Sequence, residues 1–320
     1  MDDVIVIGAG VIGLTCAVRL LESGARVRVL TADDPARTVS RLAAAVWYPT
    51  RTSPDPRVLA WAHATYDELM DQAAAGIPGV ARRPTRMLVH DDATPGGRDE
   101  AGGEGGAPWW SAAVPDFTMH PGEWRFTVPS VEMEPYLAWL AERVHDLGGE
   151  VTRGRVERLA DLDGQAGAVV NATGLAARVL AQDPAVFPAR GQIVMVANPG
   201  LVTSVRDEEH PGGMTYVHPR SHDVVLGGTY EPDEWSETPD PATTAAILRR
   251  CAELVPELEG ARPLWEAAGL RPARHGGPRV EVDPAPLPGA GTKIVHAYGH
   301  GGAGVTLSWG CADEVVRLAS

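Results

Sequence analysis

The chain has 320 residues, enough for about two domains, and its hydrophobic content of 44% is ordinary for a globular protein. A formal net charge of -14 argues against nucleic acid or an anionic membrane as a partner, because both require a basic surface. Cys16, Cys251 and Cys311 form no CxxC pair, so we expect neither a disulfide framework nor a metal site.

The first thirty residues predict a βαβ unit. Residues 4–7 form an apolar run that predicts a strand, 14–23 have helical spacing, and 27–30 predict a second strand. The first run is too short for a signal peptide or a membrane span, and no basic region precedes it. We therefore expect a cytoplasmic protein with no membrane partner.

The middle of the chain predicts further helices and strands. A helix is expected from about residue 58 to 75, and the Gly-, Asp- and Glu-rich stretch at 91–108 predicts an exposed loop. Residues 134–147 place apolar side chains on one helical face, and a strand is expected near Val151. Residues 168–170 predict a strand that leads into a turn.

Later segments alternate with a period of two. The runs 192–196, 215–220 and 224–229 are typical of an antiparallel sheet. A strand at 294–297 and a terminal helix that ends at residue 319 then restore the α/β pattern.

A G-x-G-x-x-G turn at residues 8–13 lies between the first strand and the first helix. This context favours dinucleotide binding, because the second glycine admits a pyrophosphate and the third lets the helix pack closely on the strand. A purely structural turn is the alternative. An acid directly after the second strand is missing, since Leu30-Thr31-Ala32 precede Asp33.

A second glycine-rich turn, at residues 299–304, opens the terminal helix. It either caps a buried helix or presents free N–H groups to a ligand that becomes negative during reaction. A reduced flavin is such a ligand. Two distant turns that share one crevice would suit FAD, with the pyrophosphate at the first turn and the reactive ring at the second.

Other candidate residues are ambiguous when taken alone. Arg271 and Arg274 could be surface arginines, the ring of Tyr216 could belong to the core, and His300 could be structural. The chain carries no HExxH or clustered histidine ligands and no Ser/His/Asp order that suggests hydrolysis.

Together these segments resemble the D-amino-acid oxidase family of flavoenzymes, within the glutathione-reductase-like FAD superfamily. The resemblance runs in order through residues 6–14, 43–47, 171–174, 190–193, 226–229, 271–272, 298–304 and 309–312. It implies non-covalent FAD bound by Gly8, Ala9, Gly10, Ile12, Gly13, Ser40, Ala45, Val46, Val156, Thr173, Gly301, Gly302, Gly304, Val305 and Thr306.

The resemblance also implies an activity. Arg271 would bind the substrate carboxylate, Tyr216 would donate to it, and the Gly302 carbonyl would accept from the amine. Hydride transfer from Cα to flavin N5 would then oxidise a neutral D-amino acid to a 2-oxo acid, ammonia and, with oxygen, hydrogen peroxide. A homodimer is a further expectation.

By the same resemblance the fold is α/β, with a Rossmann-like FAD-binding domain and an inserted, antiparallel β-rich substrate domain. We expect the FAD-binding domain to comprise residues 1–50, 130–190 and 262–320. Residues 51–129 and 191–261 would form the substrate domain.

The chain departs from the family pattern at several places. Gly212 stands where mammalian members carry a lid tyrosine, Tyr48 replaces a glutamine, and Ala303 replaces an aromatic residue. Ala32-Asp33 replace an acid-arginine pair near the adenosine. The lid and the substrate range therefore stay open.

Four alternatives remain. D-aspartate oxidase shares the scaffold but has an arginine where this chain has Tyr230, although Arg220 or His218 could compensate by turning inward. Glycine or sarcosine oxidase fits the terminal block less well. A nicotinamide-dependent dehydrogenase or a catalytically silent flavin-binding module would share the first turn.

Overall fold

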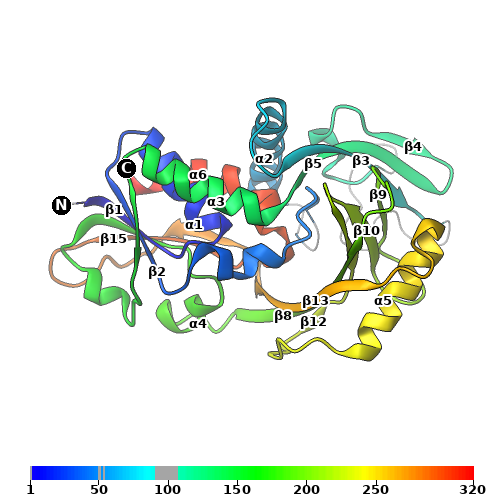
Figure 1. Cartoon of the computed structure of the whole chain (residues 1–320). Coiled ribbons are helices and arrows are strands. Elements are labelled where there is room, and N and C mark those ends of the chain that lie inside the picture. Colours follow the sequence, from blue (N-terminus) through cyan, green and yellow to red (C-terminus); the bar gives the residue numbers. More distant parts are fainter. Residues whose placement is uncertain (1, 50–51, 53–54, 91–106) are drawn as a thin grey trace.

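The computed structural model describes residues 2–49, 52, 55–90 and 107–320. Two sheets dominate this part of the chain (Figure 1). The helices are α1 (Val11–Glu22), α2 (Pro56–Ala74), α3 (Met133–Asp146), α4 (Ala177–Leu180), α5 (Pro241–Leu254) and α6 (Gly304–Ala319). Most of the expected loop at 91–108 lies outside the described residues.

The first sheet has six strands, in the order β14-β15-β7-β1-β2-β6. All neighbours are parallel except the pair β14–β15. Their bounds are β1 (Asp2–Ile7), β2 (Val27–Thr31), β6 (Glu150–Arg153), β7 (Ala166–Asn171), β14 (Arg279–Val282) and β15 (Lys293–Tyr298). Helices α1, α3 and α6 lie along one face of this sheet (Figure 1).

The second sheet has nine strands and is almost entirely antiparallel. The order is β12-β8-β11-β10-β9-β3-β5-β4, and β13 also pairs with β8. The bounds are β3 (Val80–Leu88), β4 (Thr118–His120), β5 (Glu123–Val131), β8 (Val186–Ala197), β9 (Ser204–Asp207), β10 (Thr215–Pro219), β11 (Asp223–Gly227), β12 (Glu231–Pro232) and β13 (Pro263–Arg274). Helix α5 packs against β8, β10 and β11.

The structure confirms the helices and strands that the sequence predicts, with displaced ends. α1 begins three residues earlier than expected, at Val11, because Gly10 is already its N-cap. β8 is longer than residues 192–196, and eleven of its twelve residues are buried. A strand buried on both faces loses the alternation that pattern reading relies on.

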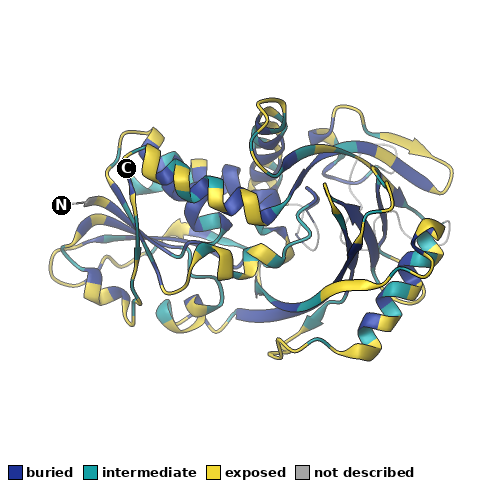
Figure 2. Ribbon diagram, in the orientation of Figure 1, coloured by how far each residue is buried: buried dark blue, intermediate teal, exposed yellow. Residues whose placement is uncertain are grey.

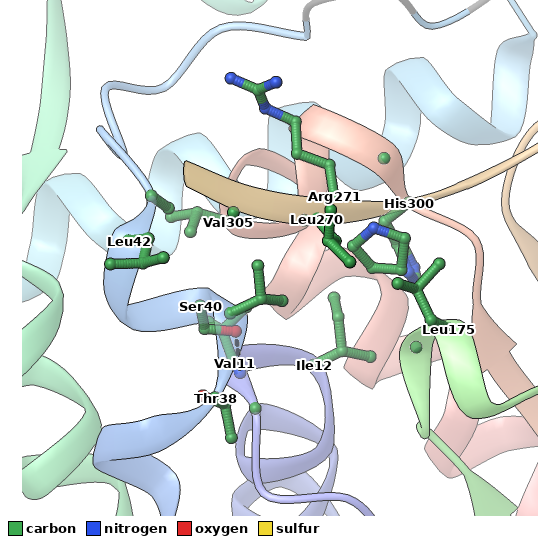
Figure 3. A pocket seen from close by; sticks show the side chains of 18 of the residues that line it. Val11, Ile12, Thr38, Ser40, Leu42, Leu175, Leu270, Arg271, His300 and Val305 are labelled. Atoms are coloured by element: carbon green, nitrogen blue, oxygen red, sulfur yellow. Dashed lines mark hydrogen bonds between the residues drawn. The ribbon is translucent and has the colours of Figure 1, made fainter. Parts of the chain in front are cut away.

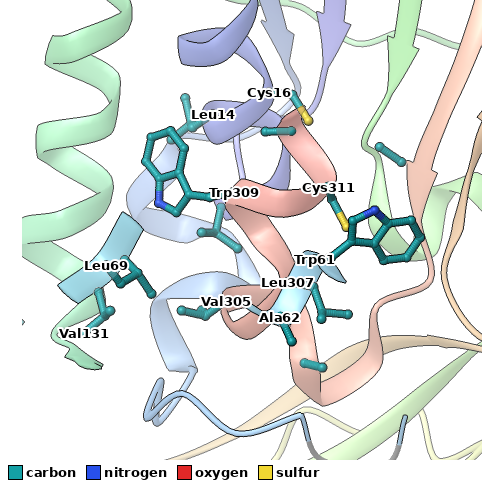
Figure 4. Packing of buried hydrophobic residues seen from close by; sticks show 14 of the residues in the cluster. Leu14, Cys16, Trp61, Ala62, Leu69, Val131, Val305, Leu307, Trp309 and Cys311 are labelled. Carbon is teal, nitrogen blue, oxygen red and sulfur yellow. The ribbon is translucent and has the colours of Figure 1, made fainter. Parts of the chain in front are cut away.

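The main hydrophobic core lies between the helices and the first sheet, and Figure 2 shows the buried residues along the facing sides of α1 and α6. Trp61, Trp309 and Leu69 join α2 to α6 within it (Figure 4). The indole nitrogen of Trp309 donates to the hydroxyl of Tyr136 at 2.8 Å, so its polar atom is satisfied although the ring is buried. Of the helices within the described ranges, none is long and apolar enough to cross a membrane.

Gly310 lets α2 and α6 touch. A Cβ at this position would overlap the backbone of Trp61, and the Gly310 amide donates to the Thr65 hydroxyl at 3.0 Å. We expect Gly310→Ala to destabilise the protein by about 1–3 kcal/mol, because the added methyl group would press on backbone atoms, which cannot move aside by a change of rotamer. Thermal unfolding should show the loss, and an unchanged unfolding midpoint would contradict this account of the helix contact.

Candidate functional site

A cavity of about 620 Å³ extends from the glycine turn after β1 to the second sheet. Figure 3 shows part of its lining, with Val11, Ser40, Arg271 and His300 contributed by distant segments. The lining includes these residues expected from the sequence: Gly8, Ala9, Gly10, Ile12, Ser40, Ala45, Val46, Val156, Thr173, Gly301, Gly302, Gly304, Val305, Thr306, Tyr216 and Arg271. Gly13 is the one expected residue that does not line it.

The first glycine turn depends on close backbone approach. Gly8 has φ +106°, and a Cβ there would lie 2.5 Å from the carbonyl oxygen of Ala172. A Cβ on Gly13 would overlap the carbonyl oxygen of Gly8, so Gly13 acts by letting α1 pack against the turn. The glycine pattern is therefore required by this geometry.

The N-terminus of α1 faces the cavity without a capping side chain of its own. Gly10 is the N-cap, and the hydroxyl of Ser40 accepts from the amide of Val11 at 3.1 Å (Figure 3). Helix N-termini carry partial positive charge and amide donors, which favour a phosphate group.

The end of β2 supplies an acid to the cavity despite the unusual sequence there. Thr31, Ala32 and Asp33 all belong to the lining. The Thr31 hydroxyl donates to the Asp33 carbonyl at 2.6 Å, which fixes this turn. Asp34 points elsewhere and accepts from the Ala36 amide. Asp33 is thus the acid that the turn after β2 contributes to the cavity lining.

The second glycine turn reaches the cavity from the opposite end of the chain. A 3-10 turn at Gly301–Ala303 precedes α6, and Ala303 gives that helix no side-chain cap. The Thr306 hydroxyl exchanges hydrogen bonds with the backbone N–H and carbonyl of Tyr48, at 3.1 and 3.0 Å. Thr306 therefore fixes the Tyr48 segment beside the α6 N-terminus.

His300 immediately precedes this turn and is buried. Its Nε2 makes no hydrogen bond with any residue that the structure describes. Burial lowers the pKa of His300 to about 4, so its imidazole is neutral at pH 7. A neutral ring with an uncommitted nitrogen in the lining can donate to or accept from a bound ligand.

Tyr216 lies on the face of the second sheet that borders the cavity. Its partners across the strands are Arg206 on β9 and Gly227 on β11. A Cβ on Gly227 would overlap the Tyr216 ring, so the glycine allows the ring to lie flat over β11. The His218 ring stacks on Tyr216 with centroids 4.8 Å apart.

The electrostatics of Tyr216 reflect two arginines. Burial raises the pKa of the Tyr216 phenol, while the positive charges of Arg271 and Arg206 act in the opposite direction. The phenol therefore stays protonated near pH 7 and can donate. Burial, together with Arg206, holds the pKa of His218 well below its usual value, so His218 is neutral.

Arg271 extends from β13 over Gly191 of β8. Its Nη1 donates to the carbonyl of Thr229 at 3.0 Å, and a Cβ on Gly191 would overlap the guanidinium. The Thr229 hydroxyl in turn accepts from the Gln192 amide at 3.0 Å. A glycine on one strand and a backbone acceptor on another thus fix the guanidinium in place, with donors left for a carboxylate.

Arg190 supports the segment that carries Tyr230. Its side chain is 5% exposed and pairs with Glu231 at 2.7 Å. The same guanidinium donates to the carbonyls of Ser236 and Thr238. Arg190 therefore ties residues 231–238 to β8 beside the cavity.

Several residues considered from the sequence lie elsewhere. Arg274 pairs with Asp183 at 2.8 Å, and Arg220 pairs with Asp223 at 2.6 Å. Neither arginine is among the lining residues, so Arg220 does not compensate for Tyr230 as the sequence left open. A Cβ at Gly212 would lie 2.6 Å from the Arg250 side chain, so that arginine occupies the space beside Gly212.

Sequence reasoning missed Arg206. This residue is buried, lines the cavity and carries its guanidinium 3.9 Å from the centre of the Tyr48 ring. No motif surrounds it in the sequence. Its place in the site follows from the pairing of the short buried strand β9 with the strand of Tyr216, which the sequence analysis did not predict.

Comparison with known proteins agrees with this architecture. The family model described as "FAD dependent oxidoreductase" matches residues 3–318. A D-amino-acid oxidase from Rubrobacter xylanophilus is 48% identical, over 98% of this chain and 95% of the relative. A human D-aspartate oxidase is 34% identical, over 98% of this chain and 94% of the relative.

Solved structures show the same fold. A glycine oxidase from Geobacillus kaustophilus superposes with a TM-score of 0.78 over 99% of this chain and 94% of that structure, at 22% identity. The family model and the curated relative from Rubrobacter xylanophilus each align with nearly the whole chain. The chain therefore belongs to the family of FAD-dependent oxidoreductases that includes the D-amino-acid oxidases.

Proposed function

We propose that this protein oxidatively deaminates neutral D-amino acids with FAD, forming 2-oxo acids, ammonia and hydrogen peroxide. The observation that carries the proposal is that Arg271 and Tyr216 line the same cavity as both glycine turns. A carboxylate anchor is thereby joined to a dinucleotide site. Family membership and the relative named D-amino-acid oxidase support the same activity.

The lining fits FAD at both ends. At the first end, the Gly8 turn, the α1 N-terminus and Ser40 would hold the pyrophosphate, and Asp33 would bind a ribose hydroxyl. At the second end, residues 301–306 would contact the ring system, where the positive end of α6 favours negative charge. Ala45, Val46, Val156 and Thr173 complete the proposed contacts.

The substrate would be held at three points. Arg271 binds its carboxylate as a two-pronged ion pair, Tyr216 donates to the same carboxylate, and the Gly302 carbonyl accepts from the amine. These contacts orient the Cα hydrogen for one enantiomer, so catalysis rests on positioning. Bound FAD would supply the chemistry by accepting a hydride and passing its electrons to oxygen.

The side chain of the preferred substrate would be neutral. Tyr230, in the lining, offers no cation for a second carboxylate, and the lining residue Arg206 is already paired with Glu208. Burying an unpaired carboxylate costs several kcal/mol. We expect a higher kcat/KM for D-leucine or D-methionine than for D-aspartate. A preference for D-aspartate would instead assign the chain to the D-aspartate oxidases.

Anaerobic mixing of the purified yellow protein with D-amino acids tests the activity. We expect the flavin absorbance to bleach with D-leucine and to return, with hydrogen peroxide, when oxygen is admitted. L-leucine serves as the matched control. A protein that binds no flavin but reduces a nicotinamide would be a dehydrogenase, and a yellow protein that never bleaches would be a silent binding module.

Finer features of the fold belong to the same proposal. We assign residues 1–50, 130–190 and 262–320 to a Rossmann-like, glutathione-reductase-like FAD domain, and 51–129 and 191–261 to an inserted substrate domain. The division of the strands between the two sheets supports this assignment. Strand β13 is an exception, because it falls in the proposed FAD domain but pairs with β8 in the second sheet. A homodimer and a cytoplasmic location remain predictions, which light scattering and cell fractionation would test.

A further inference from the structure

We propose that Glu208 determines substrate specificity by occupying Arg206, which would otherwise bind the side-chain carboxylate of an acidic D-amino acid. The inference rests on the proposed oxidase function and adds a residue that controls it. Glu208 itself does not line the cavity, so it would act through its ion pair.

Arg206 and Arg271 approach the cavity from different sides of Tyr216. The sheet order β9-β10-β11-β8, continued by β13 on β8, places three strands between the two arginines. Tyr216, on β10, is the cross-strand neighbour of Arg206, and both arginine charges act on its phenol. A substrate whose α-carboxylate binds Arg271 would therefore lie in the same cavity as a second cation, Arg206.

Arg206 is held in place. Its side chain is 7% exposed, and its guanidinium lies over the Tyr48 ring, a cation–π contact. The Tyr48 backbone is fixed in turn by Thr306. These contacts leave the guanidinium little freedom to withdraw from the cavity wall.

Glu208 gives this cation an internal counter-charge. It forms an ion pair with Arg206, and its own side chain is 20% exposed. An acidic substrate would have to displace this carboxylate or crowd a third charge beside it, and either is unfavourable in a desolvated site. A neutral substrate side chain meets neither penalty, so the Arg206–Glu208 pair makes the cavity selective against acidic D-amino acids.

Glu208→Gln tests the inference because it keeps the shape of the side chain and removes its charge. We expect the ratio of kcat/KM for D-glutamate to that for D-leucine to rise about 10- to 100-fold, since close charge pairs at desolvated sites couple strongly. Inhibition by glutarate relative to butyrate should strengthen in the same direction, which gives a readout that does not depend on turnover.

Glu209→Gln is the matched control, because it removes the same charge one residue away at an exposed position. Its ratio should stay at the wild-type value. In the double variant Glu208→Gln/Arg206→Gln, the kcat/KM ratio of D-glutamate to D-leucine should no longer rise. The inference would be overturned if Glu208→Gln changed neither the kcat/KM ratio nor the inhibition by glutarate, or if Glu209→Gln gave an equal rise. A wild-type protein that turns over no D-amino acid would instead overturn the proposed function.

Discussion

Replacing Arg271 with alanine should lower kcat/KM for D-leucine about 200- to 5,000-fold while the protein stays folded and yellow. Removing one partner of a desolvated, two-pronged ion pair costs roughly 3–5 kcal/mol, because the remaining carboxylate is left without compensation. Within the described residues the Arg271 guanidinium donates to the Thr229 carbonyl alone, so its loss should disturb the fold little. Steady-state kinetics and the flavin content per chain measure both parts.

Three further variants separate charge from geometry. Arg271→Lys keeps the positive charge but cannot bind a carboxylate with two parallel hydrogen bonds, so its activity should lie between those of Arg271→Ala and wild type. Gly191→Ala leaves Arg271 intact but places a methyl group where the guanidinium lies, and it should also reduce activity. Arg262→Ala, an exposed arginine just before β13, should behave as wild type. Near-normal efficiency of Arg271→Ala would refute its role as the carboxylate anchor.

Gly13→Ala should produce a protein that retains little FAD and unfolds at a lower temperature. The added methyl would overlap the Gly8 carbonyl oxygen, which is backbone and cannot rotate away. We expect a loss of roughly 3 kcal/mol or more in stability, at the upper end of overpacking effects. The turn would also shift away from the geometry that leaves the α1 N-terminus open to a phosphate.

The ratio of flavin to protein after gel filtration, and the unfolding midpoint with and without added FAD, measure this effect. Gly167→Ala is a suitable control, because Gly167 lies on β7 of the same sheet and a Cβ there would make an ordinary contact, 3.4 Å from the Asp3 carbonyl oxygen. A Gly13→Ala protein with a full complement of FAD would show that the turn can widen without loss of function.

Local patterns were sufficient wherever the physical requirement is local. The turn at residues 8–13 needs glycine for backbone approach, and the period of α3 follows from burial of one helical face. Strands β1 and β7 of the first sheet read as apolar runs because both of their faces are buried. These features, with the family resemblance, predicted the βαβ unit, the second glycine turn and sixteen residues of the cavity lining.

Strands whose pattern depends on distant partners were not predictable. β3, β5 and β13 mix arginine, proline and glycine with apolar residues, and they become strands because long cross-strand pairing satisfies their backbone groups. Local propensity is a weak guide where tertiary pairing decides the structure.

The substrate end of the cavity was likewise decided by tertiary structure. The sequence by itself indicated a dinucleotide site, and its family resemblance predicted an arginine–tyrosine clamp for a carboxylate. Sheet register placed Arg206 beside Tyr216, and the packing of α5 filled the space at Gly212 with Arg250. The Arg220–Asp223 pair, by contrast, forms within a local turn. Whether a charged side chain faces a cavity or an ion-pair partner depends on the residues that pack around it, and the neighbours on other strands and helices are fixed only by the tertiary structure.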